Sequence, residues 1–258
     1  MDLELRDRVV LITGAGGGAG PTVAQAFAAE GAVVALHQRA MSIAGDRPSR
    51  AEVAAREIVS AGGRALAVSA DLGSTDEIRA MTERIRTEVG TVAVLVTATS
   101  AYRSDRFAEI DDEAWASVVD DLLGATFRTC RAVVPGMVEA GWGRIVNIAA
   151  RSGLVGVSRA AHYGAAKAGI IGLTASLAKE LGPSGILVNA VAPTQLLTVK
   201  DGVPSIADER AAMLTILPHP ASTIPGTTAR QVRNVAPSRS STVEPQASSS
   251  ISTKRSFR

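Results

Sequence analysis

The run Arg8-Val-Val-Leu-Ile-Thr13-Gly14-Ala-Gly-Gly-Gly-Ala-Gly20 is a short apolar stretch followed by a turn rich in glycine. An apolar helical pattern follows over residues 23–29, and a second apolar stretch covers residues 32–36. A strand, a glycine turn, a helix and a second strand make one βαβ unit. The run therefore predicts that the fold begins with two parallel strands joined by a helix.

The glycine turn is also a candidate ligand site. Glycines at such a turn let the backbone approach a pyrophosphate, whose charge is met by N–H groups at the helix N-terminus. Pro21 is compatible with the first helical turn, where the N–H groups have no intrahelical partner. The alternative is a glycine-rich loop that binds no ligand.

A second pattern, Tyr163-Gly-Ala-Ala-Lys167, lies much later in the chain. Four residues apart on a helix, the two side chains share one face. An ammonium beside a phenol favours the phenolate, so a tyrosine with an ordinary pKa near ~10 exchanges its proton closer to neutral pH. The pair therefore suggests acid–base chemistry, although a tyrosine and a lysine on a solvated helix face would have the same spacing.

Together, Thr13-Gly14-x-x-x-Gly18-x-Gly20 and Tyr163-x-x-x-Lys167 resemble the short-chain dehydrogenase/reductase family. The resemblance runs from about residue 6 to residue 198. Further matching stretches are Ala70-Asp71-Leu72, Gly143-Arg-Ile-Val-Asn-Ile148 and Gly185-Ile-Leu-Val-Asn-Ala-Val-Ala-Pro193. The resemblance implies an α/β fold of three layers, a doubly wound, Rossmann-like parallel sheet in one domain, which binds a nicotinamide dinucleotide.

The same resemblance implies roles for individual residues. Tyr163 corresponds to the catalytic acid/base, and Lys167 to the residue that binds the ribose and tunes the tyrosine. Asp71 corresponds to the residue that holds the adenine ring. The expected cofactor contacts are Thr13, Gly14, Gly18, Gly20, Arg39, Asp71, Leu72, Tyr163, Lys167 and Pro193. No metal site is expected.

The choice of cofactor is argued from Leu36-His37-Gln38-Arg39, at the end of the second strand. Folds that prefer NAD place a carboxylate there for the ribose 2′-hydroxyl, whereas a nearby arginine accommodates a 2′-phosphate. The acid is missing and Arg39 follows, so NADP(H) is expected over NAD(H), which remains possible. Alternatively, Arg39 is a solvated residue at a strand end. His37 is interpreted as a packed or exposed histidine, not a ligand.

Two departures from the family pattern concern the catalytic site. The family places a serine thirteen residues before the tyrosine, where this chain has Ala150, and an asparagine in the long fourth helix, where it has Asp121. Losing one donor to a developing oxyanion lowers turnover by ~10²–10³. Asp121 is expected to pair with the Lys167 ammonium and weaken its effect on Tyr163. Ser152 can replace the serine only if its loop is rearranged.

Two more departures lie at strand ends. The Asn-Asn-Ala-Gly stretch that usually closes the fourth strand is Thr97-Ala-Thr-Ser100 here, and the usual Pro-Gly after the sixth strand is Pro193-Thr194.

Composition limits the remaining functions. The chain has 258 residues, 46% of them hydrophobic, which suffices for one large α/β domain. A net charge of +2 is too small to argue for nucleic-acid binding, and no apolar run approaches the ~20 residues of a membrane span. The single cysteine, Cys130, excludes an internal disulfide and fits a reducing compartment. With no signal peptide recognised, we expect a cytoplasmic protein.

The C-terminal part differs in character from residues 1–200, which are expected to form the dinucleotide-binding domain. Residues 201–258 are interpreted as divergent, with a possible short helix over 206–217. Residues 218–258 are rich in Ser, Thr, Pro and Arg, a composition that favours disorder and a solvated basic tail. A shifted reading frame near residue 200 would look the same.

Two functions from different classes remain. The first is an NADP(H)-dependent oxidoreductase acting on a small carbonyl compound or secondary alcohol. The second is a family member that has lost redox chemistry and binds the cofactor as a scaffold, or performs non-redox chemistry in the same cleft. A homodimer is expected through the helices over residues 112–140 and 160–181. Their small residues are Ala125, Ala132, Ala165, Ala168, Gly169 and Gly172.

Overall fold

A computed structural model describes residues 3–39, 48–193, 199–200, 203–204 and 215–217. Its main sheet contains the strands β1 (Val9–Thr13), β2 (Val33–Gln38), β3 (Arg64–Ser69), β4 (Val92–Thr97), β5 (Gly143–Ile148), β6 (Ile186–Ala192) and β9 (Thr215–Leu217). Their order is β3-β2-β1-β4-β5-β6-β9, and every pair except β6–β9 is parallel. The strand order reverses between β1 and β4, so the predicted doubly wound sheet is confirmed. In such sheets, ligands bind at the carboxyl ends of the strands beside this reversal.

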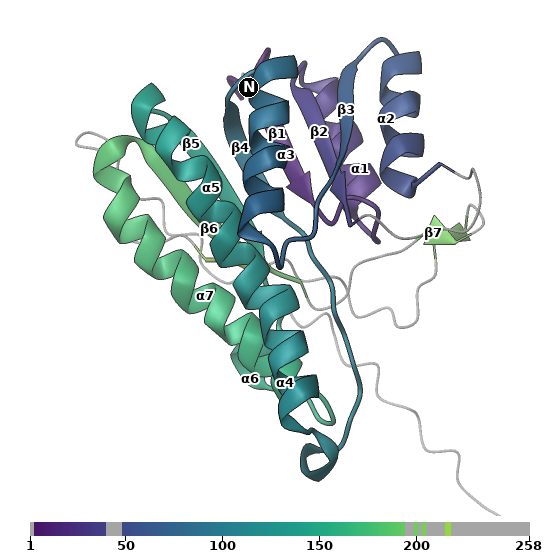
Figure 1. The fold of residues 1–258 in the computed structure, drawn as a ribbon, viewed down its shortest axis with the longest axis vertical. Helices are drawn as coiled ribbons and strands as arrows, with labels where there is room; N and C mark the ends of the chain where they lie inside the picture. The colour runs from purple at the N-terminus through teal and green to yellow at the C-terminus, as the bar shows by residue number, and fades with distance from the viewer. Residues whose placement is uncertain (1–2, 40–47, 194–198, 201–202, 205–214, 218–258) are drawn as a thin grey trace, which may run out of the picture.

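Helices cover both faces of the sheet and make three layers (Figure 1). The side chains of Val10 and Ile12 in β1 pack with α1 (Gly20–Ala29) and α2 (Arg50–Ser60). The alternate side chains, Val9 and Leu11, pack with α3 (Thr75–Glu88), α5 (Ala125–Ala140) and α7 (Ala161–Leu181). Successive residues of a strand point to opposite faces, which explains why the apolar runs of these central strands are continuous.

The predicted long helix over residues 112–140 is interrupted by one π-helical turn. The helix begins as α4 (Asp112–Val119), passes through η2 (Asp120–Gly124) and continues as α5. Single π-turns within α-helices are frequent at functional sites. Figure 1 shows α4, α5 and α7 running alongside one another, with the short α6 (Ser152–Val155) at one end of the group. The short 3₁₀ segments are η1 (Phe107–Glu109) and η3 (Gly182–Ser184).

The C-terminal part contributes short strands. β7 (Val199–Lys200) and β8 (Val203–Pro204) form an antiparallel ribbon, and β9 adds to the outer edge of β6. The helix predicted over 206–217 is therefore wrong at residues 215–217. This Thr-Ile-Leu triplet has β-branched residues that suit a strand, and the edge of β6 offers unpaired backbone groups. The rest of that predicted helix, and the predicted disorder over 218–258, lie outside the described residues.

The small residues expected to form the dimer faces fall into two groups. Ala165, Ala168 and Gly172 are exposed on α7. Ala125 instead belongs to the core, and a side chain at Gly169 would come within 2.6 Å of Leu123 in η2. These two positions serve packing within the chain. Ala132 is partly buried against the same core.

Within the ranges that the structure describes, no helix is both long and apolar enough to cross a bilayer.

Candidate functional site

The glycine turn lies at the carboxyl end of β1, where a side chain could not be accommodated. Gly14 has φ +70°, and a Cβ there would lie 2.6 Å from the Ala98 carbonyl oxygen. A Cβ on Gly20 would lie 2.4 Å from the Ala15 carbonyl oxygen. Gly18 is exposed at the turn itself. Gly14 and Gly20 therefore let the turn pass close to the end of β4 and continue directly into α1.

The start of α1 fits an anion such as a pyrophosphate. Pro21 lies in its first turn, as predicted, and the N-cap residue Ala19 makes no side-chain capping hydrogen bond. The first N–H groups of a helix carry partial positive charge and have no intrahelical partner. Thr13, just before the turn, is buried, and its Oγ1 has no hydrogen-bond partner among the described residues.

The His37 side chain holds the glycine turn by a hydrogen bond. Nδ1 accepts a hydrogen bond of 3.3 Å from the Gly14 N–H, so Nε2 carries the proton and donates to the Ala70 carbonyl oxygen at 2.9 Å. The ring is buried, and burial lowers the pKa of His37, which keeps it neutral. The interpretation of His37 as a packed residue is confirmed. It joins the ends of β1, β2 and β3.

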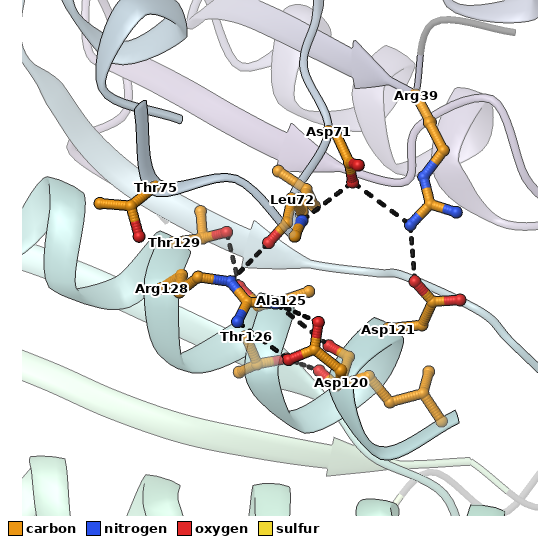
Figure 2. Close-up of polar contacts among 12 residues, drawn as sticks. Arg39, Asp71, Leu72, Thr75, Asp120, Asp121, Ala125, Thr126, Arg128 and Thr129 are labelled. Carbon is orange, nitrogen blue, oxygen red and sulfur yellow. Dashed lines mark hydrogen bonds and ion pairs between the residues drawn. The ribbon is translucent and has the colours of Figure 1, made fainter. Parts of the chain in front are cut away.

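Arg39 follows β2 and meets carboxylates from two other elements, as Figure 2 shows. Nη2 donates to Oδ1 of Asp121 in η2 at 2.6 Å and lies 3.5 Å from Oδ1 of Asp71, after β3. The hydrogen bond to Asp121 is the main cause that raises the pKa of Arg39.

The position of Asp121 corrects an expectation from the sequence. Asp121 was expected to pair with Lys167, but its carboxylate accepts from Arg39. A regular helical register does not apply across η2, because a π-turn has hydrogen bonds five residues apart and changes the facing of the side chains within it. The predicted weakening of Lys167 by Asp121 therefore has no contact to support it in the described part of the chain.

Arg128 holds the loop after β3, which contains two predicted cofactor contacts. Its Nε donates to the Leu72 carbonyl oxygen at 2.7 Å, and its two terminal nitrogens donate to the Asp120 carboxylate at 2.9 and 2.8 Å (Figure 2). Asp71 Oδ1 accepts from the Gly73 N–H at 2.9 Å. The sequence did not identify Arg128 or Asp120, since their pairing depends on the path of the chain through η2.

Tyr163 and Lys167 lie on α7 at the carboxyl end of β5. Lys167 is buried, and its Nζ donates to the Ile148 carbonyl oxygen at 2.8 Å and lies 5.7 Å from the centre of the Tyr163 ring. Burial lowers the pKa of Lys167 to about 8. The pKa of Tyr163 is raised, mainly by burial and then by Tyr102, whose ring packs edge-on at 5.1 Å. The direction of this shift in the free protein is opposite to the predicted lowering of the phenol pKa, and its main cause is burial.

The segment after β5 lacks the serine hydroxyl donor that the family has there. Ala150 has only a methyl group, and Ser152, which begins α6, has a buried Oγ with no hydrogen-bond partner in the described ranges. Gly153 packs directly on α7, because a Cβ there would lie 2.7 Å from the Lys167 carbonyl carbon. The Pro193 carbonyl oxygen accepts from the Arg151 N–H at 3.0 Å, which ties the end of β6 to the same segment.

Two contacts around Tyr163 were not anticipated. His162 is fully buried, its Nδ1 accepts from the Tyr163 N–H at 3.0 Å, and its Nε2 lies 3.3 Å from Oδ2 of Asp105. Asp105 belongs to the segment after β4, which also carries Tyr102. The pair thus anchors that segment beside Tyr163. The sequence places His162 beside Tyr163, but it gives no signal for the pairing with Asp105.

A family model described as short chain dehydrogenase matches residues 8–202 of the chain. The chain belongs to the short-chain dehydrogenase/reductase family. Nodulation protein G of Azospirillum brasilense is 34% identical over 189 residues, which are 73% of this chain and 74% of that protein. The 3-oxoacyl-(acyl-carrier-protein) reductase FabG of Staphylococcus aureus is 35% identical over 209 residues, covering 81% and 82% of the two chains.

Two further comparisons support the assignment of this short-chain dehydrogenase/reductase to the family. The probable galactose dehydrogenase GalD of Rhizobium meliloti is 38% identical over 199 residues, covering 76% of this chain and 74% of that protein. The crystal structure of a short chain dehydrogenase from Mycobacterium avium superposes with a TM-score of 0.70 at 34% identity, over 76% of this chain and 71% of the other. The family is one of oxidoreductases that use a nicotinamide dinucleotide and act on small carbonyl or alcohol substrates.

The described residues fit such a cofactor. The crowded Gly14 and Gly20 backbone and the start of α1, which has no side-chain cap, suit a pyrophosphate. The Asp71–Leu72 loop, Lys167 and Pro193 lie at the same carboxyl edge of the sheet, since they follow or face the ends of β3, β5 and β6.

Proposed function

We propose that this protein is an NADP(H)-dependent oxidoreductase that acts on a small carbonyl compound or secondary alcohol. The observation that carries the proposal is the buried Lys167, held by the Ile148 carbonyl oxygen beside Tyr163 at the edge of the sheet where the Gly14 turn lies. A buried ammonium is costly, and such groups mark functional sites more often than surface groups do.

In the proposed mechanism, Tyr163 is the general acid. Its pKa is raised, so the phenol holds its proton at neutral pH and can donate it to a carbonyl oxygen. When bound, the nicotinamide ring supplies the hydride. Lys167 holds its position through Ile148 and binds the ribose. The charge that it carries below about pH 8 favours anionic character on the phenol after the proton has left. A raised phenol pKa favours carbonyl reduction over alcohol oxidation near neutral pH.

The proposed cofactor contacts are the residues that were expected from the sequence. The proposal includes the backbone of Gly14, Gly18 and Gly20 with Thr13 for the pyrophosphate side, Asp71 and Leu72 for the adenine, and Tyr163, Lys167 and Pro193 for the nicotinamide side. Arg39 is proposed to bind the 2′-phosphate, which makes NADP(H) the preferred cofactor and leaves NAD(H) a weaker ligand. The support is the cation at the end of β2 and the lack of an acid in Leu36-His37-Gln38.

Arg39→Ala should weaken NADPH binding by roughly five- to thirty-fold, because one charge-assisted contact at a half-exposed site is lost. NADH binding should change little, since it has no 2′-phosphate. Fluorescence titration of both cofactors measures the two dissociation constants. Arg79→Ala, which removes an exposed cation on α3, is the matched control. Equal affinities in the parent protein, or an Arg39 variant without loss, would contradict the assignment.

Turnover is tested separately by following NADPH oxidation with a panel of aldehydes and ketones. The second candidate, a scaffold or non-redox protein that binds the cofactor, is favoured by Ala150 and by the Ser152 hydroxyl, which has no hydrogen-bond partner among the described residues. Cofactor binding with no turnover on any carbonyl would select this candidate over the first.

The assembly is proposed to be a homodimer through α4, α5 and α7. Ala165, Ala168 and Gly172 leave α7 open to close packing, and Trp115 and Phe127 expose apolar surface on the other two helices. We expect equilibrium sedimentation to give twice the chain mass. A tetramer would show that the C-terminal part forms a second interface, and a monomer would show that the open α7 face has no such role.

We also propose a domain boundary near residue 200 and a cytoplasmic location for the protein. Residues 1–200 form the dinucleotide-binding domain, supported by the family match over 8–202, and residues 201–258 form a divergent segment. The single buried cysteine, Cys130, is compatible with the cytoplasm.

A further inference from the structure

The ion pair between Arg39 and Asp121 connects two elements that belong to different parts of the chain. Arg39 stands at the end of β2 and Asp121 in the π-turn η2, and their side chains meet at 2.6 Å (Figure 2). Asp71, after β3, is the more distant carboxylate at 3.5 Å. The cation proposed to receive the 2′-phosphate is thus already engaged by protein carboxylates in the free protein.

The two adjacent aspartates of η2 have different partners. Asp120 accepts two hydrogen bonds from Arg128, which also holds the Leu72 carbonyl oxygen, so it supports the loop after β3. Within the described ranges, the ion pair of Asp121 is with Arg39. The Asp121 side chain is 32% exposed and that of Arg39 is 54% exposed, so an incoming anion can reach this pair.

We infer that Asp121 reduces the preference for NADPH by competing with the 2′-phosphate for Arg39. The inference rests on the proposed cofactor. A dinucleotide that carries the phosphate replaces one anionic partner of Arg39 with another and places a phosphate near two carboxylates. A dinucleotide with a 2′-hydroxyl leaves the Arg39–Asp121 pair in place. Asp121 therefore lowers the affinity for NADPH selectively and narrows its advantage over NADH.

The size of the effect follows from the exposure of the pair. Partly exposed ion pairs contribute modestly, and releasing Arg39 from one is expected to change binding by roughly two- to five-fold. A phosphate monoester has a second pKa of about 6 and carries its full charge above that pH. The competition between the 2′-phosphate and Asp121 for Arg39 should therefore be strongest there. Added salt should reduce the effect, because it screens half-exposed charges.

The experiment compares Asp121→Asn with Asp120→Asn, which removes the same charge from the same π-turn but breaks the pair with Arg128. Dissociation constants for NADPH and NADH are measured by fluorescence titration, and those for adenosine 2′,5′-bisphosphate and ADP by calorimetry. The smaller ligands report the adenosine end alone. The same measurements on Arg39→Ala and on Arg39→Ala/Asp121→Asn complete a double-mutant cycle. Thermal unfolding of each protein shows that it is folded.

The expected result is a rise in the NADPH:NADH affinity ratio of roughly two- to five-fold in Asp121→Asn, no such rise in Asp120→Asn, and none in the Arg39→Ala background. An unchanged ratio in Asp121→Asn, or a rise that persists without Arg39, overturns the competition. A parent protein that binds NADPH no better than NADH overturns the proposed cofactor preference instead. In that case, the double-mutant cycle still decides whether Asp121 acts through Arg39.

Discussion

Replacing Tyr163 with phenylalanine should lower kcat for carbonyl reduction by about 10²–10⁴, the usual contribution of a positioned acid. The phenol is the proton donor in the proposed mechanism, and its raised pKa keeps it protonated near neutral pH. The ring itself should stay in place, because the substitution keeps its edge-on contact with Tyr102. Cofactor binding should remain measurable, which separates a lost acid from a lost fold. Steady-state kinetics on an accepted carbonyl compound, with a parallel NADPH titration, measures both quantities.

Tyr102→Phe is the matched control for this variant, since it removes a phenol from the adjacent ring of the same pair. It should stay close to the parent in kcat. If Tyr163→Phe keeps parental activity, or Tyr102→Phe loses as much as Tyr163→Phe, then Tyr163 is not the acid.

The pH dependence of kcat/KM tests Lys167 within the same mechanism. Burial lowers the pKa of Lys167 to about 8, so it is charged below this pH and neutral above it. The pKa of Tyr163 is raised, so the phenol stays protonated across this range. Reduction should therefore weaken as the pH rises through about 8, as Lys167 loses its charge. Lys167→Arg, which remains charged, should shift this decline to higher pH or remove it.

Restoring a hydroxyl with Ala150→Ser should raise turnover by up to ~10², the scale of one donor to a developing oxyanion. Ala150 lies between the end of β5 and α6, thirteen residues before Tyr163, and its methyl group donates no hydrogen bond. A serine at this position would place a donor where the family has one. The measurement is kcat on the best carbonyl substrate of the parent protein.

Ser152→Ala controls for the other hydroxyl of this segment. If the buried Ser152 Oγ has taken over the donor role, Ser152→Ala should lower turnover and Ala150→Ser should add little. A flat or reduced turnover in Ala150→Ser, with Ser152→Ala also neutral, would mean that the site has been rebuilt for other chemistry. That outcome would favour the second candidate function.

The parts of the site that were predicted correctly depend on local patterns. Gly14 and Gly20 at the two ends of the turn require glycine, because a Cβ there would lie 2.6 and 2.4 Å from backbone oxygens, and both positions can be read directly from the sequence. Tyr163 and Lys167 share a helix face because of their spacing alone. The two apolar stretches at residues 8–13 and 32–36 likewise predicted β1 and β2 close to their observed bounds.

The errors arose where partners are distant in sequence. The register of a regular helix placed Asp121 beside Lys167, but the π-turn η2 changes the facing of its side chains, and Asp121 meets Arg39 from β2. The pairing of Arg128 with Leu72, and that of His162 with Asp105, have no signal in a one-dimensional pattern. The strand at residues 215–217 depends on the open edge of β6 more than on its own three residues.

Local backbone geometry and apolar periodicity were sufficient to predict the first βαβ unit, the glycine turn and the shared helix face of Tyr163 and Lys167. The charge states and the partners within the site depend instead on how the chain packs. Burial raises the pKa of Tyr163 and lowers that of Lys167, which reversed the expectation for the phenol. Burial and ion pairing depend on which distant segments pack together, and the free energy of charging a side chain follows that packing.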